Sequence, residues 1–340
     1  VTAAQLLHGS ANAIGGQSAL IKLKWGTTPE EMKIDQAAGF IKCALGENVK
    51  QANWGDRNVI RFPQTRMGVE QVFYDAFYRA KKYRSEQEAF AKGQTKIAPR
   101  KDIELDVLNE ILEGRRFITC HSYVQSEVNM LMKVADSMGF KVNTFTHILE
   151  GYKVADKMKE HGVGASTFAD WWAYKFEVND AIPYNAALMH KLGITVAINS
   201  DDAEMGRRLN QEAAKTIKYG GVSEEEAWKM VTLNPAKLLH LDDKMGSIKV
   251  GKDADLVLWT ANPLSIEAQV KSTMIEGVFY FDREQDLILQ AQNQSEKIRI
   301  FSLMRSKELQ LEPKQPFFKR KKKHFHCDTM GEEGTESENL

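Results

Sequence analysis

Three side chains that can bind a metal ion occur at similar points of the chain. His121, His147 and Asp201 each come directly after a short apolar segment. Two imidazoles and one carboxylate form a donor set that suits a divalent ion such as zinc. If the three apolar segments are strands of one parallel sheet, their carboxyl ends meet at one edge of that sheet. The sequence therefore predicts a metal site at which His121, His147 and Asp201 converge.

The apolar segments alternate with segments of helical periodicity, a pattern typical of parallel α/β sheets. There are seven strand candidates of this kind, whereas a closed barrel has about eight. The candidates are residues 1–7, 18–24, 39–44, 117–120, 142–146, 163–166 and 194–200. The predicted fold class is α/β: a TIM-like (β/α)8 barrel that lacks its first strand, with a small C-terminal β subdomain.

Helices are predicted between and after these strands, at residues 68–91, 102–113, 125–138, 152–160, 185–191, 205–219 and 223–232. A strand–turn–strand unit at 246–259 and a hairpin at 270–281 predict the β subdomain. We expect three parts: a metal-binding barrel with strands 2–8 at residues 1–240, the β subdomain at 241–282, and a helical and then disordered, charged tail at 283–340.

The composition excludes several classes of protein. The formal net charge is zero, so no overall field favours nucleic acid or an anionic membrane. Three cysteines are too few for a disulfide framework or a cysteine metal site. No apolar run approaches the roughly 20 residues of a membrane helix. Because the chain begins within a strand candidate and without Met, we expect it to be cut from a longer chain, and its localisation stays open.

The strand-end residues and two later motifs resemble the metal-dependent amidohydrolase superfamily, in particular its imidazolonepropionase and Xaa-Pro dipeptidase-like branch. The motifs are Asn-Pro-Ala at residues 234–236 and Gly-Lys-Asp-Ala-Asp-Leu-Val at residues 251–257. The resemblance extends over residues 1–282. It implies that His121 and His147 bind metal, and that Asp201 binds metal and shuttles protons.

The resemblance also implies a bridging ligand. Many family members hold two metal ions with a carboxylated lysine at the end of the fourth strand, a position that Lys42 matches best. Glu47 is a weaker substitute. The family's His-x-His pair at the end of the first strand has no counterpart, because His8 stands alone before residue 121. This departure agrees with the expected N-terminal truncation, which would weaken metal binding.

Aromatic residues near the predicted site indicate a substrate pocket. Trp171 and Trp172 follow the strand candidate at residues 163–166, in a segment that lacks helical periodicity. Tyr123 lies two residues after His121. We predict that these three side chains contact the substrate.

The predicted function is hydrolysis of a C–N amide bond by metal-activated water, in a cyclic amide or a dipeptide-like substrate, with one or two divalent ions, zinc being the first choice. Asp201 would act as base and then acid. Two alternatives stay open: a catalytically inactive fragment or scaffold that has lost its metal site, and a metal-free barrel enzyme that uses His121 or His147 as a proton carrier. The expected partner is a small molecule, and a homo-oligomer is compatible with the sequence.

Overall fold

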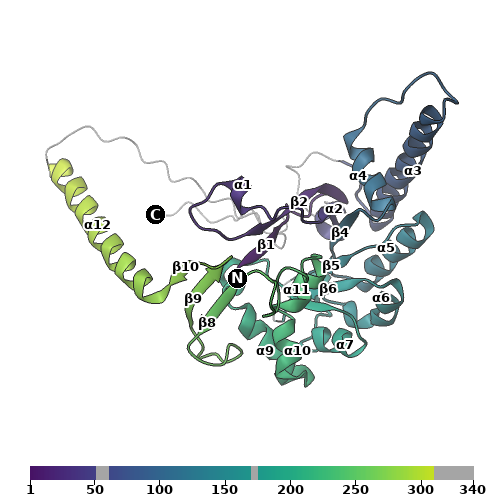
Figure 1. The fold of residues 1–340 in the computed structure, drawn as a ribbon. Helices are drawn as coiled ribbons and strands as arrows, with labels where there is room; N and C mark the ends of the chain where they lie inside the picture. Colours follow the sequence, from purple (N-terminus) through teal and green to yellow (C-terminus); the bar gives the residue numbers. More distant parts are fainter. Residues whose placement is uncertain (51–60, 170–174, 310–340) are drawn as a thin grey trace.

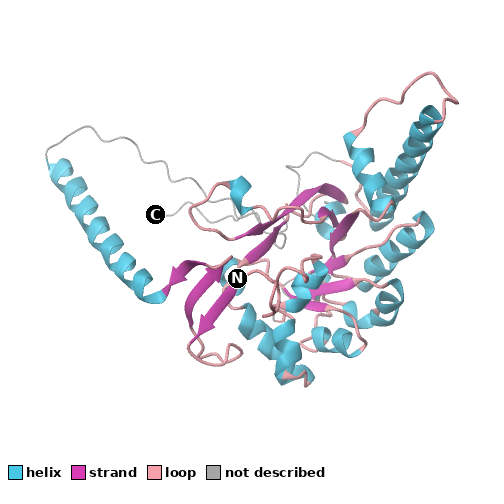
Figure 2. Cartoon of the chain, viewed as in Figure 1, coloured by secondary structure: helices cyan, strands magenta, loops and turns pink. Residues whose placement is uncertain are grey.

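The computed structural model describes residues 1–50, 61–169 and 175–309. Within them, seven strands lie side by side in chain order and form a curled sheet (Figure 1, Figure 2). The strands are β1 (Ala3–Leu6), β2 (Ile14–Lys22), β3 (Gly39–Ala44), β4 (Arg116–His121), β5 (Thr144–Thr146), β6 (Gly164–Thr167) and β7 (Val196–Ile198). A second sheet contains β8 (Leu256–Trp259), β9 (Val270–Ile275) and β10 (Val278–Asp282). The predicted α/β class with a small additional sheet is confirmed.

The first two strands differ from the prediction. β1 pairs with β2, and β2 with β3, in antiparallel fashion, whereas the neighbours from β3 to β7 are parallel. The prediction of parallel barrel strands is therefore wrong for residues 1–7 and 18–24. Only residues 7–13 connect β1 to β2, and a parallel crossover needs about a dozen or more. The described chain thus forms a parallel half-barrel that continues into an antiparallel pair.

Helices follow the parallel strands, and several of them cover the convex face of the sheet (Figure 1). They are α2 (Glu47–Lys50), α3 (Arg66–Ala91), α4 (Ile103–Leu112), α5 (Gln125–Met138), α6 (Ala155–His161), α7 (Asn185–Lys191), α8 (Ala203–Gly206), α9 (Leu209–Gly220), α10 (Glu224–Lys229) and α11 (Leu233–Leu238), with α1 (Pro29–Met32) before β3. Short 3-10 helices are η1 (Gly151–Lys153) and η2 (Phe176–Val178). The predicted helices at 125–138 and 185–191 are confirmed at both ends, whereas the one at 205–219 is divided into α8 and α9.

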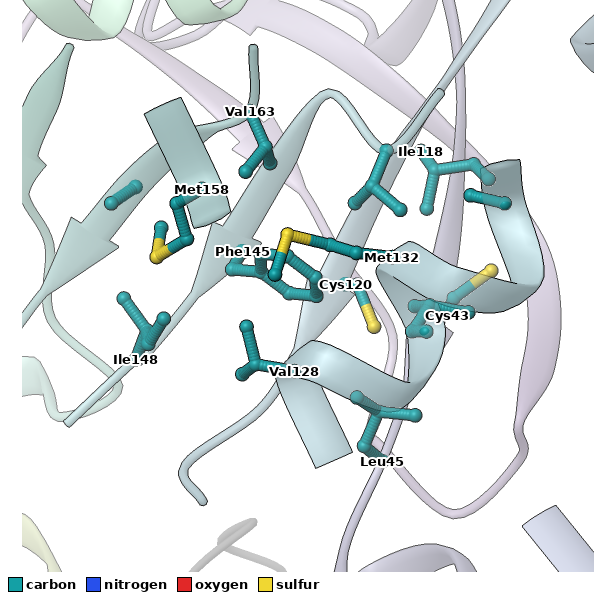
Figure 3. Packing of buried hydrophobic residues seen from close by; sticks show 14 of the residues in the cluster. Cys43, Leu45, Ile118, Cys120, Val128, Met132, Phe145, Ile148, Met158 and Val163 are labelled. Atoms are coloured by element: carbon teal, nitrogen blue, oxygen red, sulfur yellow. The ribbon is translucent and has the colours of Figure 1, made fainter. Parts of the chain in front are cut away.

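The main hydrophobic core lies between the parallel strands and these helices. Phe145 of β5 is fully buried there (Figure 3). Its cluster includes Val128, Met132, Ile148, Met158 and Val163. Side chains alternate across β3: Ile41 belongs to this cluster, and Phe40 to a smaller one on the other face. Lys42 has the parity of Phe40, so it points away from the helix-covered face.

The outer edge of β7 is occupied by the chain that follows it. Ile198 N donates a hydrogen bond to Met230 O at 2.9 Å, on the side away from β6. Asn234 Nδ2 donates to Val196 O at 2.8 Å on the same side. The Asn-Pro-Ala motif therefore holds α11 against the last parallel strand.

A buried lysine joins the small sheet to β2. Lys22 Nζ lies 2.5 Å from Asp253 Oδ2, 3.2 Å from Asp255 Oδ2 and 3.1 Å from Glu276 Oε1. Burial alone would lower the pKa of Lys22, but its contacts with these carboxylates raise it overall. The motif at residues 251–257 thus supplies two carboxylates of an ionic contact between the two sheets, which we call the Lys22 cluster (Lys22, Asp253, Asp255 and Glu276).

The sequence predicts a strand, a turn and a second strand at residues 246–259. In the structure, residues 246–255 form turns, bends and loops, and only the second strand is present, as β8. Gly246 and Gly251 have φ values of 84° and 94°, which an extended strand does not contain. Lys252 Nζ also donates to Met245 O at 3.1 Å and to Ser247 Oγ at 2.8 Å. The predicted hairpin at 270–281 is confirmed as β9 and β10.

A long helix, α12 (Arg283–Leu309), projects from the small sheet (Figure 1). It lies at the start of the tail at residues 283–340, where we expect a helical part. The helices in the described ranges include none with the length and apolar character to cross a membrane. The predicted charged, disordered end of the tail lies outside the described residues.

Candidate functional site

The two predicted histidines meet at the carboxyl edge of the parallel strands. His121 ends β4, and its register partner on β5 is Thr146, directly before His147. The two imidazole centroids are 5.2 Å apart, and both residues are buried. His147 has a φ of 62°, a left-handed conformation that is costly for a residue other than glycine. Such strain is often found at functional sites, where the surrounding structure enforces it.

Both imidazoles are held in the neutral form. Burial lowers the pKa of His121 and of His147 well below the usual value, and the positive charges of Lys42 and Lys175 lower it further. For His121, proximity to His147 adds to the effect. A neutral imidazole is the form that binds a metal ion.

Asp201 approaches the histidine pair from the end of β7. Its Oδ1 lies 4.0 Å from His147 Nε2, and the side chain is 25% exposed. The next residue, Asp202, serves a different purpose, because its side chain accepts hydrogen bonds from Glu204 N and Met205 N and caps α8. One of the two adjacent carboxylates is thus committed to a helix end, and the other faces His147.

Asn199 orients the ring of His147 from behind. Its amide nitrogen lies 2.7 Å from His147 Nδ1, while its Oδ1 is buried without a hydrogen-bond partner among the described residues. Rotating this amide by half a turn would let Oδ1 accept from Nδ1–H and leave Nε2 with its lone pair towards Asp201. A partner on the remote ring nitrogen fixes the tautomer in many histidine metal ligands.

The donor types fit a divalent ion. His121 Nδ1 is buried and makes no hydrogen bond to any described residue, as expected of a nitrogen reserved for a ligand. In residues 1–50, 61–169 and 175–309, however, no group of three or more His, Cys, Asp or Glu side chains lies close enough to form a metal cluster by itself. The chain therefore presents two neutral imidazoles with a nearby carboxylate rather than a compact cage.

Of the other predicted site residues, Lys42 and Tyr123 lie near the two histidines, whereas Glu47 makes other contacts. Lys42 is fully buried on β3 and is close enough to both imidazoles to lower their pKa values. Tyr123 is buried, and its ring meets the His121 ring edge-on at a centroid distance of 4.6 Å. Trp171 and Trp172 lie outside the described residues. Glu47, the weaker ligand candidate, instead pairs with Lys50 at 2.7 Å.

Several residues at this edge were not identified from the sequence. The ring of Phe168 stacks on His147 at a centroid distance of 4.8 Å. Lys175 Nζ lies 4.4 Å from the centre of the Tyr123 ring. Next to them is a partly buried group of charges that we call the carboxylate cluster. Its members are Glu47, Arg66, Glu127 and Glu177.

Burial raises the pKa of Glu127 in this cluster to about 7, and the negative charge of Glu177 acts in the same direction, although Arg66 opposes the shift. Glu127 Oε1 accepts a hydrogen bond from Arg66 Nε, whereas Oε2 is buried without a hydrogen-bond partner in the described chain. Burial also raises the pKa of Glu177. Within the carboxylate cluster, Glu127 is therefore the carboxyl group that would hold a proton near neutral pH.

The raised pKa of Glu127 predicts a specific pH dependence of stability. The folded chain binds this proton more tightly than the unfolded chain, so the stabilising effect is fully present below about pH 4.5 and is lost as the pH rises through about 7. Its size is about 3 kcal/mol. Urea unfolding of Glu127→Gln should therefore give a free energy of unfolding that falls less steeply over this range than that of the wild type. Glu104→Gln, on the exposed side of α4, is the control; equal slopes for wild type and Glu127→Gln would contradict the assignment.

Comparisons with known proteins indicate the family of the chain. A family model described as the amidohydrolase family matches residues 178–279. The amidohydrolase tasK of Hapsidospora irregularis is 28% identical over 303 residues, covering 83% of this chain and 30% of that protein. An imidazolonepropionase of Thermoplasma volcanium is 28% identical over 166 residues, covering 46% of this chain and 40% of that protein. The chain thus spans less than half the length of these two relatives.

A solved structure is similar over most of the chain. It is an amidohydrolase from Thermotoga maritima MSB8, with 31% sequence identity and a TM-score of 0.75. The match covers 83% of this chain and 72% of that one, so the fold and the sequence agree over the same large region. On this evidence, the chain belongs to the amidohydrolase family.

Proposed function

We propose that this protein is a metal-dependent hydrolase that cleaves the C–N bond of an amide. The observation that carries the proposal is the pair of buried imidazoles, His121 and His147, with Asp201 Oδ1 4.0 Å from His147 Nε2. Membership of the amidohydrolase family supports the same reaction class. A cyclic amide or a dipeptide-like compound is the proposed substrate, and the imidazolonepropionase relative supports the first of these.

The proposed cofactor is a divalent metal ion, with zinc as first choice for a site rich in imidazole. His121 and His147 would hold it through ring nitrogens and Asp201 through a carboxylate oxygen. Lys42, once carboxylated, would bridge to a second ion. When bound, the metal would polarise the scissile carbonyl and make water a better nucleophile.

The chain's own residues supply the proton transfers and the walls of the site. Asp201 would accept a proton from the attacking water and then donate it to the leaving nitrogen. Phe168 stacks on His147 and Tyr123 contacts His121 edge-on, so that two aromatic rings would limit the access of water to the imidazoles. Tyr123, Trp171 and Trp172 are proposed to contact the substrate.

The proposal is tested by metal content and hydrolysis together. The purified protein is expected to contain about one or two equivalents of divalent metal per chain. It should hydrolyse some members of a panel of dipeptides and cyclic amides, lose that activity when a strong chelator removes the metal, and regain it with zinc. His121→Asn should bind less metal, whereas His190→Asn, which replaces a histidine of α7 near Glu226, should bind as much as the wild type.

The two alternative functions give other results. A scaffold without a metal site would purify without metal and hydrolyse no member of the panel. A metal-free enzyme would keep its activity in the presence of the chelator. Either result would overturn the proposed function.

A further inference from the structure

Glu177 links the segment after β6 to the end of β3. It lies in η2 and is 5% exposed. Its Oε1 accepts a hydrogen bond from Glu47 N at 2.9 Å. A Cβ on Gly46 would lie 2.1 Å from the same oxygen. Glycine at position 46 therefore leaves the space that this carboxylate fills.

The second oxygen of Glu177 continues this link towards the histidines. Oε2 lies 3.6 Å from Lys175 Nζ, and Lys175 Nζ lies 4.4 Å from the centre of the Tyr123 ring. Tyr123 in turn contacts the His121 ring edge-on. A continuous series of contacts thus runs from the end of the strand that carries Lys42 to the first candidate metal ligand.

Apolar contacts support the same arrangement. Val178, next to Glu177, is fully buried in a small cluster with Tyr123, Leu149 and Phe168. This cluster is separate from the main core. Val178 therefore packs against the same two aromatic residues that contact the histidines, Tyr123 and Phe168, while Glu177 contacts the end of β3.

A buried carboxylate is costly unless specific partners compensate for it. Glu177 has such partners in Glu47 N and Lys175. These two contacts tie η2 to the backbone at the end of β3 and to Lys175.

We propose that Glu177 is a positioning residue of the candidate active site: by accepting a hydrogen bond from Glu47 N in the space beside Gly46, it holds Lys175 over Tyr123 and Tyr123 against His121. The relevance of this to catalysis rests on the proposed hydrolase function. The anchoring itself does not, and can be measured without activity.

The experiment compares Glu177→Ala, Glu177→Gln and Gly46→Ala with the wild type. Glu177→Ala removes both contacts, whereas Gln retains an acceptor for Glu47 N. Gly46→Ala places a methyl group against an intact Glu177, and at a φ of 88° it also strains the backbone of this turn. Glu226→Ala is the control, because it takes a carboxylate from Lys229, which keeps Glu225 as a partner.

The first readout is the rate of acetylation of Lys175 by acetic anhydride, followed by mass spectrometry, with the exposed Lys33 as internal reference. We expect this rate to rise several-fold in Glu177→Ala and in Gly46→Ala, and to return towards the wild-type rate in Glu177→Gln. An unchanged rate in both Glu177→Ala and Gly46→Ala would overturn the anchoring, whether or not the protein is a hydrolase.

The second readout is hydrolysis of whichever amide the wild type accepts. Glu177→Ala is expected to lose roughly 100-fold in kcat/KM, mainly through kcat, because small displacements of a site cost that much. Glu177→Gln should recover most of the loss, which a purely structural defect would not predict. Faster labelling of Lys175 with unchanged kcat/KM would overturn the catalytic part. Absence of hydrolysis in the wild type would count against the proposed function alone, since the labelling result stands independently.

Discussion

Asp201→Asn is expected to lower kcat by roughly 10²–10⁴-fold, the usual loss when a general acid–base group is removed. The substitution keeps the size of the side chain and its approach to His147, but it removes the ability to take up and release a proton. KM should change much less, because Asp201 is assigned to proton transfer. Steady-state kinetics at saturating metal would measure both constants.

Asp202→Asn is the matched control for this variant. It removes the same charge one residue later, yet Asn caps helices about as well as Asp, so α8 should persist. Wild-type kinetics are expected for Asp202→Asn. A similar loss in both variants would indicate that the negative charge at this edge matters, rather than proton transfer by Asp201.

Lys22→Met should lower the free energy of unfolding by about 3 kcal/mol, because it leaves buried carboxylates without their cation. Lys22 is 2% exposed and Asp255 4% exposed, whereas Asp253 and Glu276 are partly open to solvent. The loss should therefore arise mainly from Asp255. Urea or thermal unfolding would measure it, and the small sheet should become more accessible to protease.

Lys33→Met is the control. In the described structure, the ion pair of Lys33 is with Glu30, three residues earlier, and both side chains are exposed. Exposed pairs of this kind contribute little, and the variant should unfold like the wild type. If Lys22→Met did the same, the Lys22 cluster would not stabilise the junction between the sheets.

The parallel part of the sheet could be predicted because its pattern is local. Each strand there is a short apolar run before a helix, and the helix after His121 ends at Gly139, which has a φ of 74°. The meeting of His121 and His147 follows from the same pattern, because strand ends define the site. The assignment of Asp201, Lys42 and Tyr123 to catalysis or binding remains a prediction.

Other features could not be predicted because they depend on contacts between distant segments. The apolar composition of β1 and β2 does not determine whether they pair in parallel or antiparallel fashion. Their short connection, residues 7–13, does, because it is too short for a parallel crossover. Glu127 lies in a predicted helix and Glu177 in a segment without a predicted element, and only the fold brings both near Arg66. The expected strand after Gly246 failed for a related reason, since Lys252 folds that segment back onto its own carbonyl groups.

The hydrogen bonds at the outer side of β7 have a consequence for association between molecules. An edge strand with unused amide and carbonyl groups can act as a template for a strand of another chain. Asn234 and Met230 already use two of these groups. Protection of this side of the sheet against intermolecular β-sheet growth therefore depends in part on a single amide side chain that takes no part in the proposed chemistry.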